Sequence, residues 1–377
     1  MTDQPLRRLA ALGQSVWLDD LQRGMLKTGG LLERLIEEDG LSGVTSNPAI
    51  FERAIDGSTD YDLALQTLAQ ALPRPEDLYE NLTLQDVGRA ADLLRPRFED
   101  SAGKDGFVSI EVSPRLARDP IGSIAEARRL WEKLDRPNIL IKLPGTLDGL
   151  PAIGQLLRDG ININVTLLFS LERYQQVHEA YLSALEDRVR RQQPVDRLRS
   201  VASFFLSRID VLLWPRLEEL VRTNSPQAPL AGDLLGQLAI AHAKLAFQKW
   251  REVLKGSRWR ALSVRGAQPQ RLLWASTSPK NAGLDPLHYV EPLIARDTVT
   301  TLPMETLIEY RKHGRPQLRI AEHLNDAIRR MRTAEELGLS LRDAYRTLED
   351  DGIRRFVESY DKVLLSLRQK ASHPCLD

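Results

Sequence analysis

The 377-residue sequence predicts an α/β protein of the (β/α)8 TIM barrel class. Eight short apolar runs recur along the chain, and longer segments with apolar residues at helical spacing separate them. This alternation predicts parallel βα units. Eight such units favour a closed barrel over an open doubly wound sheet. We therefore expect a single barrel domain over residues 1–377.

The predicted strands are short and apolar, as buried parallel strands are. In chain order they cover residues 15–19, 43–47, 107–112, 138–146, 162–167, 200–205, 272–276 and 298–303. Between them, apolar side chains repeat every three or four residues, which predicts amphipathic helices. The clearest helical segments are residues 25–38, 123–134, 150–157, 171–185 and 234–254.

The chain is longer than the ~250 residues of a usual barrel. We therefore expect additional helices at both termini and in the 216–265 region. C-terminal helices over about 334–370 are expected to pack on the barrel, with Gly352 dividing them. Residues 192–194 and 225–229 are expected to be loops.

The composition is globular and electrically balanced. Hydrophobic residues make up 42% and charged residues 28%, and 52 basic side chains match 52 acidic ones. A zero formal net charge argues against a general nucleic-acid binder. No stretch reaches the ~20 apolar residues of a membrane span, and we find no signal-peptide pattern. The single cysteine, Cys375, excludes a disulfide within the chain, so we expect a cytoplasmic protein.

Lys142 stands inside the fourth apolar run, Asn-Ile-Leu-Ile-Lys-Leu-Pro-Gly-Thr. Burying an ammonium ion without a partner is costly, so burial favours the neutral amine. A neutral amine is a nucleophile that forms Schiff bases with carbonyl compounds. The alternative is a strand-end lysine whose amine extends into water.

Polar side chains gather at the ends of the predicted strands. In a βα barrel these ends form the active site, and a lysine, carboxylates and amides at one rim favour catalysis. Asn47 before Pro48 could instead only cap a helix, as could Asp19. The strand-end set is Asp19, Asn47, Glu111, Lys142, Asn164, Thr166, Ser203, Arg208 and Ser276.

These residue types suit carbon–carbon bond cleavage through an iminium ion. Lys142 would attack a ketone, and the positive nitrogen would accept electrons from the breaking bond. Asp19 would remove the proton from the neighbouring hydroxyl. Glu111 would move protons during Schiff-base formation, with Thr166 helping through a water, while the asparagines hold the substrate.

A metal site built on Asp19, Asp20 and Glu111 is a competing use of the same carboxylates. None of the six histidines ends a predicted strand or shows ligand spacing, so we expect no metal. The sequence has no Gly-x-Gly-x-x-Gly motif after a strand and no P-loop, so we expect no nucleotide cofactor.

Four segments together resemble the transaldolase family. They are GVTSNPAIF (43–51), IKLPGT (141–146), GININVTLLFS (160–170) and SVASFFLSRID (200–210). The opening SVWLDD and the chain length resemble its longer bacterial subfamily. The resemblance implies transfer of a dihydroxyacetone unit through a lysine Schiff base, in the non-oxidative pentose phosphate pathway. Donors would be fructose 6-phosphate or sedoheptulose 7-phosphate, and acceptors erythrose 4-phosphate or glyceraldehyde 3-phosphate.

The resemblance also implies catalytic roles. Lys142 would be the Schiff-base lysine and Asp19 the acid/base at the cleaved bond. Glu111 and Thr166 would hold the catalytic water. No cofactor is implied.

Substrate-binding roles follow in the same way from the resemblance. Arg208 would hold the phosphate, since a guanidinium fork suits it, although it could be a surface charge. Many transaldolases place a second phosphate-binding arginine after the seventh strand, and here Lys280 is the best substitute. The expected substrate-binding residues are Asn47, Asn164, Ser203, Phe205, Arg208, Ser276 and Lys280.

Two other functions fit this fold class. A simple aldolase would release the three-carbon unit, and a non-catalytic barrel would only bind sugar phosphates. Phe205 and the chain length favour transaldolase over the shorter aldolases, and the complete polar set argues against a non-catalytic barrel. We expect sugar-phosphate substrates, no nucleic-acid or membrane partner, and a monomer or homodimer.

Overall fold

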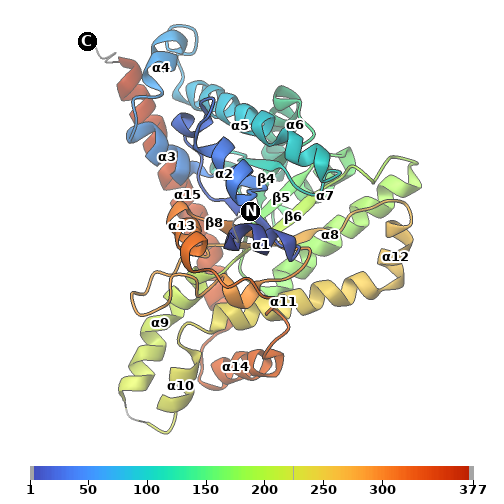
Figure 1. Cartoon of the computed structure of the whole chain (residues 1–377), viewed down its shortest axis with the longest axis vertical. Coiled ribbons are helices and arrows are strands. Elements are labelled where there is room, and N and C mark those ends of the chain that lie inside the picture. Colours follow the sequence, from blue (N-terminus) through green and yellow to red (C-terminus); the bar gives the residue numbers. More distant parts are fainter. Residues whose placement is uncertain (1–3, 224, 373–377) are drawn as a thin grey trace.

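The computed structural model describes residues 4–223 and 225–372 (Figure 1). Eight parallel strands close into one barrel in chain order, which confirms the predicted fold class. The ring closes where Ser15 pairs with Val299 and Leu18 with Leu302. The strands are β1 (Ser15–Leu18), β2 (Gly43–Thr45), β3 (Phe107–Glu111), β4 (Ile139–Pro144), β5 (Ile163–Leu168), β6 (Ser200–Phe205), β7 (Arg271–Ala275) and β8 (Val299–Leu302).

Helices surround the barrel and extend beyond it (Figure 1). The α-helices are α1 (Pro5–Ala11), α2 (Leu31–Asp39), α3 (Pro48–Asp56), α4 (Asp62–Leu68), α5 (Pro75–Asp100), α6 (Pro120–Leu134), α7 (Leu150–Asp159), α8 (Leu171–Arg190), α9 (Ser207–Arg222), α10 (Ala228–Leu234), α11 (Leu238–Lys255), α12 (Ser257–Ser263), α13 (Met304–His313), α14 (Leu324–Glu336) and α15 (Leu341–Ser372). Short 3-10 turns are η1 (Arg23–Leu26), η2 (Pro114–Leu116) and η3 (Glu291–Leu293). Additional helices therefore occur at both ends of the described chain and in the 216–265 region, as expected.

Three predicted helical segments are interrupted in the structure at positions that were not predicted. The 25–38 segment is η1 followed by α2. The 234–254 segment is divided between α10 and α11 by Gly236, whose φ of 70° requires a left-handed backbone. The prediction that Gly352 divides the C-terminal helices is wrong, because the break lies at Gly338, with φ of 73°.

One of the two predicted loops agrees with the structure, and the other is shorter than predicted. Residues 192–194 are a loop as expected. The predicted loop 225–229 ends early, because α10 already begins at Ala228. Pro229 then lies in the first helical turn, where proline is well tolerated because that N–H needs no partner.

The last helix, α15, packs across the barrel rather than beside it. It contacts α3, α5, α9 and the end of β5. Figure 1 shows it as the red helix running along α3. The helix α15 therefore contacts the barrel, whereas the assignment of all 377 residues to one domain stays a prediction.

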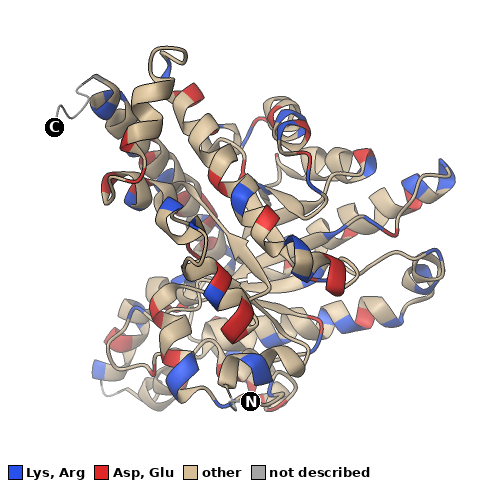
Figure 2. Ribbon diagram, turned by 45° about the horizontal axis from the view of Figure 1, so that its top comes forward, with Lys and Arg blue, Asp and Glu red and all other residues tan. Residues whose placement is uncertain are grey.

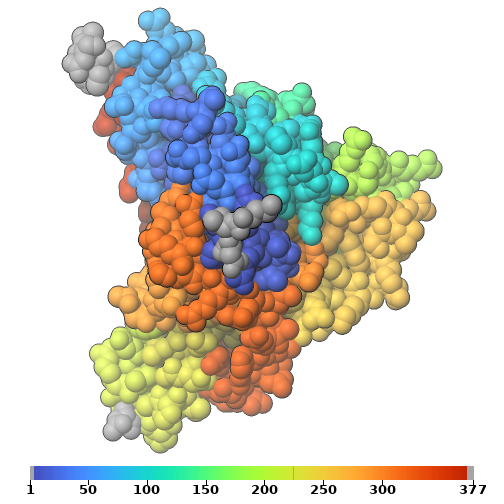
Figure 3. Space-filling view, in the orientation of Figure 1, coloured from blue at the N-terminus to red at the C-terminus, as the bar shows by residue number. Residues whose placement is uncertain are grey.

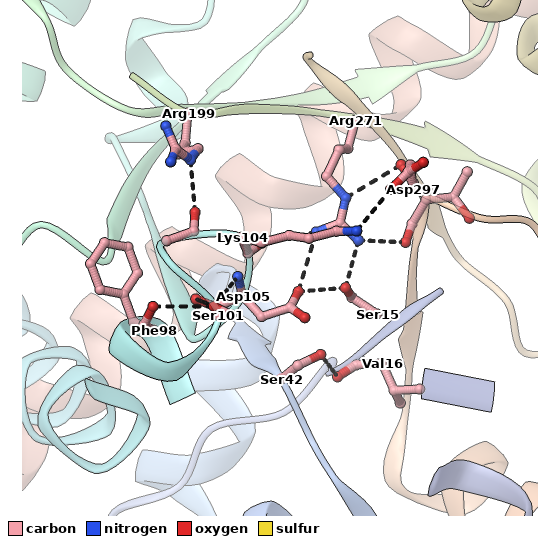
Figure 4. A network of polar contacts seen from close by, with 12 residues as sticks. Ser15, Val16, Ser42, Phe98, Ser101, Lys104, Asp105, Arg199, Arg271 and Asp297 are labelled. Atoms are coloured by element: carbon pink, nitrogen blue, oxygen red, sulfur yellow. Dashed lines mark hydrogen bonds and ion pairs between the residues drawn. The ribbon is translucent and has the colours of Figure 1, made fainter. Parts of the chain in front are cut away.

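A polar network holds the N-terminal ends of the strands together (Figure 4). The buried Arg271 guanidinium at the start of β7 lies 3.2 Å from Asp105 Oδ1 and donates to Ser15 Oγ at 2.5 Å. It also donates to the carbonyl oxygens of Lys104, Asp297 and Thr298. The buried charges of Arg271 and Asp105 therefore both have partners at this end of the barrel.

The outer surface carries both charges without a dominant sign. Figure 2 shows basic and acidic residues intermixed on the outer helices. In Figure 3 the N-terminal segments lie beside segments near residue 310, and α1 contacts α13. Within the described ranges, no helix combines the length and apolar character needed to cross a bilayer. Cys375 lies outside the described residues.

Candidate active site

A cavity of about 710 Å³ opens at the C-terminal ends of the strands. Most of the predicted site residues line it, and the exceptions, Glu111 and Asn164, touch residues that do. The predicted residues in the cavity wall are Asp19, Asn47, Lys142, Thr166, Ser203, Phe205, Arg208, Ser276 and Lys280. Residues from separate segments of the chain therefore meet at the C-terminal ends of the strands, as expected for a βα barrel.

Lys142 lies at the floor of this cavity. Parallel register places it between Glu111 of β3 and Asn164 of β5, so the three side chains project from the same side of the sheet. Lys142 is 4% exposed. Its Nζ donates to the Ser46 carbonyl at 3.2 Å and lies 3.5 Å from Glu111 Oε2. The amine therefore does not extend into bulk water.

Glu111 is a buried carboxyl beside this amine. Burial raises its pKa to about 7, although the nearby Lys142 partly opposes the shift. Its Oε2 makes no hydrogen bond to any described residue, and neither does Oγ1 of the fully buried Thr166. Buried polar atoms without a protein partner mark positions where water or a ligand completes the bonding.

Asp19 follows β1 and its backbone N–H still donates to Leu302 of β8. Burial raises the pKa of Asp19, while the charges of Lys142 and Arg53 oppose the shift. Burial also raises the pKa of Asp20, which accepts a hydrogen bond from Gln22. In the part of the chain that is described, His, Cys, Asp and Glu side chains form no group of three suited to a metal ion.

Amides and hydroxyls form a second layer around the lysine. Asn164 donates to Ser109 Oγ at 3.0 Å and accepts from Ser203 Oγ at 2.7 Å. These bonds fix the amide orientation across three strands. Asn47 caps α3 by accepting from Ile50 N–H, so the capping interpretation is confirmed, and the same side chain also lines the cavity.

One end of the cavity is cationic. Arg208, in the first turn of α9, is half-buried and lies over the Phe205 ring at 5.3 Å. Burial lowers its pKa, and its Nη1 has no hydrogen-bond partner among the described residues. Ser276, with a left-handed φ of 56°, places its Oγ 2.8 Å from Ser207 Oγ. Arg208 is therefore not a freely solvated surface charge.

Lys280 is exposed at this end of the cavity. Its Nζ lies 3.5 Å from Ser278 Oγ. It lines the wall with Ser276 and Ser278. An exposed lysine at this position can contact a bound anion, but its amine is neither buried nor held in place.

Several cavity residues were missed by the sequence analysis. Arg53, which lines the cavity, looked like an exposed residue of a helix. Ser109, which accepts a hydrogen bond from Asn164 behind the cavity wall, looked like an ordinary strand residue. The larger omission is α15, which supplies Leu348, Asp351, Arg355 and Phe356. They fall at positions i, i+3, i+7 and i+8, which share one helix face, but nothing local indicates that this face covers the barrel.

The family model for transaldolase/fructose-6-phosphate aldolase matches residues 16–367. The chain belongs to this family. A transaldolase of Thiobacillus denitrificans is 44% identical over 95% of this chain and 98% of that protein. A transaldolase of Thermobifida fusca is 42% identical over 98% of this chain and 99% of that protein. "Transaldolase 2" of a Nostoc species is 38% identical over 97% of each.

The transaldolase/fructose-6-phosphate aldolase family includes two activities, so the family match alone does not separate them. The relatives named above are all transaldolases and align along nearly their whole length. Their match therefore extends over the added helices as well as the barrel.

Proposed function

We propose that this chain is a transaldolase that moves a dihydroxyacetone unit between sugar phosphates through a Schiff base on Lys142. The main support is the buried amine of Lys142, 3.5 Å from the Glu111 carboxyl at the cavity floor. An amine held out of water next to a group that exchanges protons near neutral pH can condense with a ketone. The full-length transaldolase relatives point to the same activity.

In the first step, Lys142 Nζ bonds to the keto carbon of the donor. The carbonyl oxygen then leaves as water, and an iminium ion remains. Glu111 accepts the amine proton and returns a proton to the departing oxygen, through a water held with Thr166. Glu111 Oε2 and Thr166 Oγ1, which make no hydrogen bond to a described residue, are the atoms available for that water.

In the second step, Asp19 removes the proton from the hydroxyl next to the bond that breaks. An aldehyde leaves, and the electron pair moves into the iminium ion to form an enamine on Lys142. The enamine carbon then attacks the acceptor aldehyde, Asp19 returns its proton, and water releases the new ketose. The raised pKa of Asp19 suits both directions of this transfer.

The substrate is oriented by groups on both sides of the lysine. Asn47, Asn164 and Ser203 would bind its hydroxyls. Arg208 would bind its phosphate, because it offers buried N–H donors and positive charge. Donors would be fructose 6-phosphate or sedoheptulose 7-phosphate, and acceptors erythrose 4-phosphate or glyceraldehyde 3-phosphate. We place the enzyme in the cytoplasm, in the non-oxidative pentose phosphate pathway, as a monomer or homodimer.

The proposal is tested by trapping the intermediate. Incubation with fructose 6-phosphate and borohydride should leave a three-carbon adduct on Lys142, found by peptide mass mapping. Lys142→Ala should abolish both adduct and transfer while its circular dichroism stays that of wild type. An adduct on another lysine, or none, would contradict the Schiff-base assignment.

A simple aldolase is the second candidate, favoured by the shared family. An assay with fructose 6-phosphate, with and without erythrose 4-phosphate, separates the two. Transaldolase activity requires the acceptor, whereas an aldolase releases dihydroxyacetone without it.

The phosphate role of Arg208 gives a further prediction. Arg208→Ala should raise KM for fructose 6-phosphate by about 10- to 100-fold, because a charge-assisted hydrogen bond is lost. Borohydride trapping of unphosphorylated dihydroxyacetone should change far less. Equal losses for both compounds would remove the phosphate role.

A further inference from the structure

One wall of the cavity comes from α15, more than 300 residues after β1 in the sequence. Leu348, Asp351, Arg355 and Phe356 share one helix face, and all of them line the cavity. The Phe356 ring centre lies 5.8 Å from Nζ of Lys142. This helix therefore borders both the lysine and the cationic end of the site.

Gly352 brings α15 close to the barrel. A Cβ atom at this position would lie 2.9 Å from Cδ2 of Leu167 and 3.7 Å from Nη1 of Arg208. Leu167 has a left-handed φ of 59° and lies where the pairing of β5 with β6 shifts register. Such an irregularity redirects a strand-end side chain. Glycine at 352 thus lets the helix backbone pass directly over Arg208.

Three residues further along, Arg355 faces the same end of the cavity as Arg208. Its Nε lies 2.6 Å from Asp351 Oδ2. After burial, the charge of Arg355 is the next cause that lowers the pKa of Arg208. Both arginines line this cavity. Like charges repel one another, and an anion bound between the two guanidinium groups would relieve that repulsion.

We propose that Arg355 is a substrate-binding residue that joins Arg208 in holding the phosphate of the sugar. This inference rests on the proposed function, because it places a phosphorylated sugar in the cavity. Asp351 holds Arg355 at the cavity mouth, and a phosphate dianion competes with Asp351 for the same guanidinium. Arg355 takes precedence over Lys280 as the second phosphate ligand, since a guanidinium binds phosphate through two parallel N–H groups.

The first test compares neighbouring arginines of α15. Arg355→Ala should raise KM for fructose 6-phosphate by about 10- to 100-fold. Trapping of unphosphorylated dihydroxyacetone on Lys142 should change less than about twofold. Arg354→Ala is the matched control, because Arg354 is also exposed and also pairs with Asp351 but does not line the cavity. Its KM should stay near wild type, and Arg355→Lys should lie between.

The second test uses inorganic phosphate, with binding measured by calorimetry in the absence of turnover. Arg355→Ala should weaken phosphate binding, and Asp351→Asn should strengthen it by removing the competing carboxylate. A folding defect cannot produce the second result. The inference is overturned if Arg355→Ala behaves like Arg354→Ala, if Asp351→Asn weakens binding, or if only Lys280→Ala loses phosphate. Failure of the proposed function would appear separately, as wild-type enzyme that traps no ketose on Lys142.

Discussion

At the scale of single residues, three buried polar atoms in or beside the cavity make no hydrogen bond within the described part of the chain. Glu111 Oε2, Thr166 Oγ1 and Arg208 Nη1 are buried without a hydrogen bond to any residue the structure describes. Each such atom lowers the free energy of unfolding by about 1–3 kcal/mol. Natural proteins accept this cost where a substrate or water supplies the missing bond.

Glu111 sets an expected pH dependence. Its pKa is raised to about 7 by burial, so below that pH it is protonated and cannot accept the proton of the attacking amine. We expect kcat/KM to fall as the pH drops through about 7. Glu111→Gln should lower kcat by about 10²- to 10⁴-fold and remove this inflection. A pH–rate profile that keeps the inflection in the variant would assign it to another group.

At the scale of elements, a buried carboxyl joins two of the added helices. Asp210 of α9 accepts hydrogen bonds from the backbone N–H groups of Leu238 and Ala239, at the start of α11. It also accepts from the Tyr289 hydroxyl at 2.8 Å. Asp210 thus caps α11 and orients α9, the helix that presents Arg208 to the cavity.

The same residue makes stability depend on pH. Burial raises the pKa of Asp210 to about 7 from an ordinary value of 3.8. The folded state therefore binds its proton more tightly than the unfolded state, and this contribution is lost as pH rises through about 7. The stability advantage of wild type over Asp210→Asn should shrink between about pH 5 and pH 8. Urea unfolding of both proteins at each pH measures this stability difference. A difference that grows with pH would contradict the predicted direction.

At the scale of the whole molecule, the two ends of the barrel are built differently. At the N-terminal end, the Arg271 guanidinium makes five hydrogen bonds to groups from both sides of the ring (Figure 4). At the C-terminal end, donors and acceptors face a cavity instead. One end holds the strands in place so that the other can present reactive groups at fixed positions.

Removing the clamp should destabilise the fold. Arg271→Met leaves Asp105 buried without its charge partner, which should lower the free energy of unfolding by about 3–5 kcal/mol. The exposed Arg265 provides a control. Arg265→Met should change the free energy of unfolding by less than about 0.5 kcal/mol. Urea unfolding midpoints compare them. Equal effects of the two variants would show that the network contributes little.

Much of the site could be predicted from the sequence, because the alternation of side chains along a strand and the end of a strand are local properties. Alternating strands and helices predicted the barrel, and strand-end polar residues predicted which groups would share one rim. Lys142 stood out since its neighbours are apolar. These inferences need only the pleat of a strand and the rule that parallel strands end at one face.

Helix breaks were predicted less well, since a glycine can end a helix or permit close packing. Gly338 does the first and Gly352 the second. The two look alike in sequence, and only the neighbour that each one meets separates them.

Contacts between distant segments were decided by the tertiary structure alone. Arg271 meets Asp105, and α15 passes over Leu167 and Arg208, at separations that no local pattern encodes. Local periodicity specifies which face of an element is buried, whereas the partner of that face depends on how the whole chain closes.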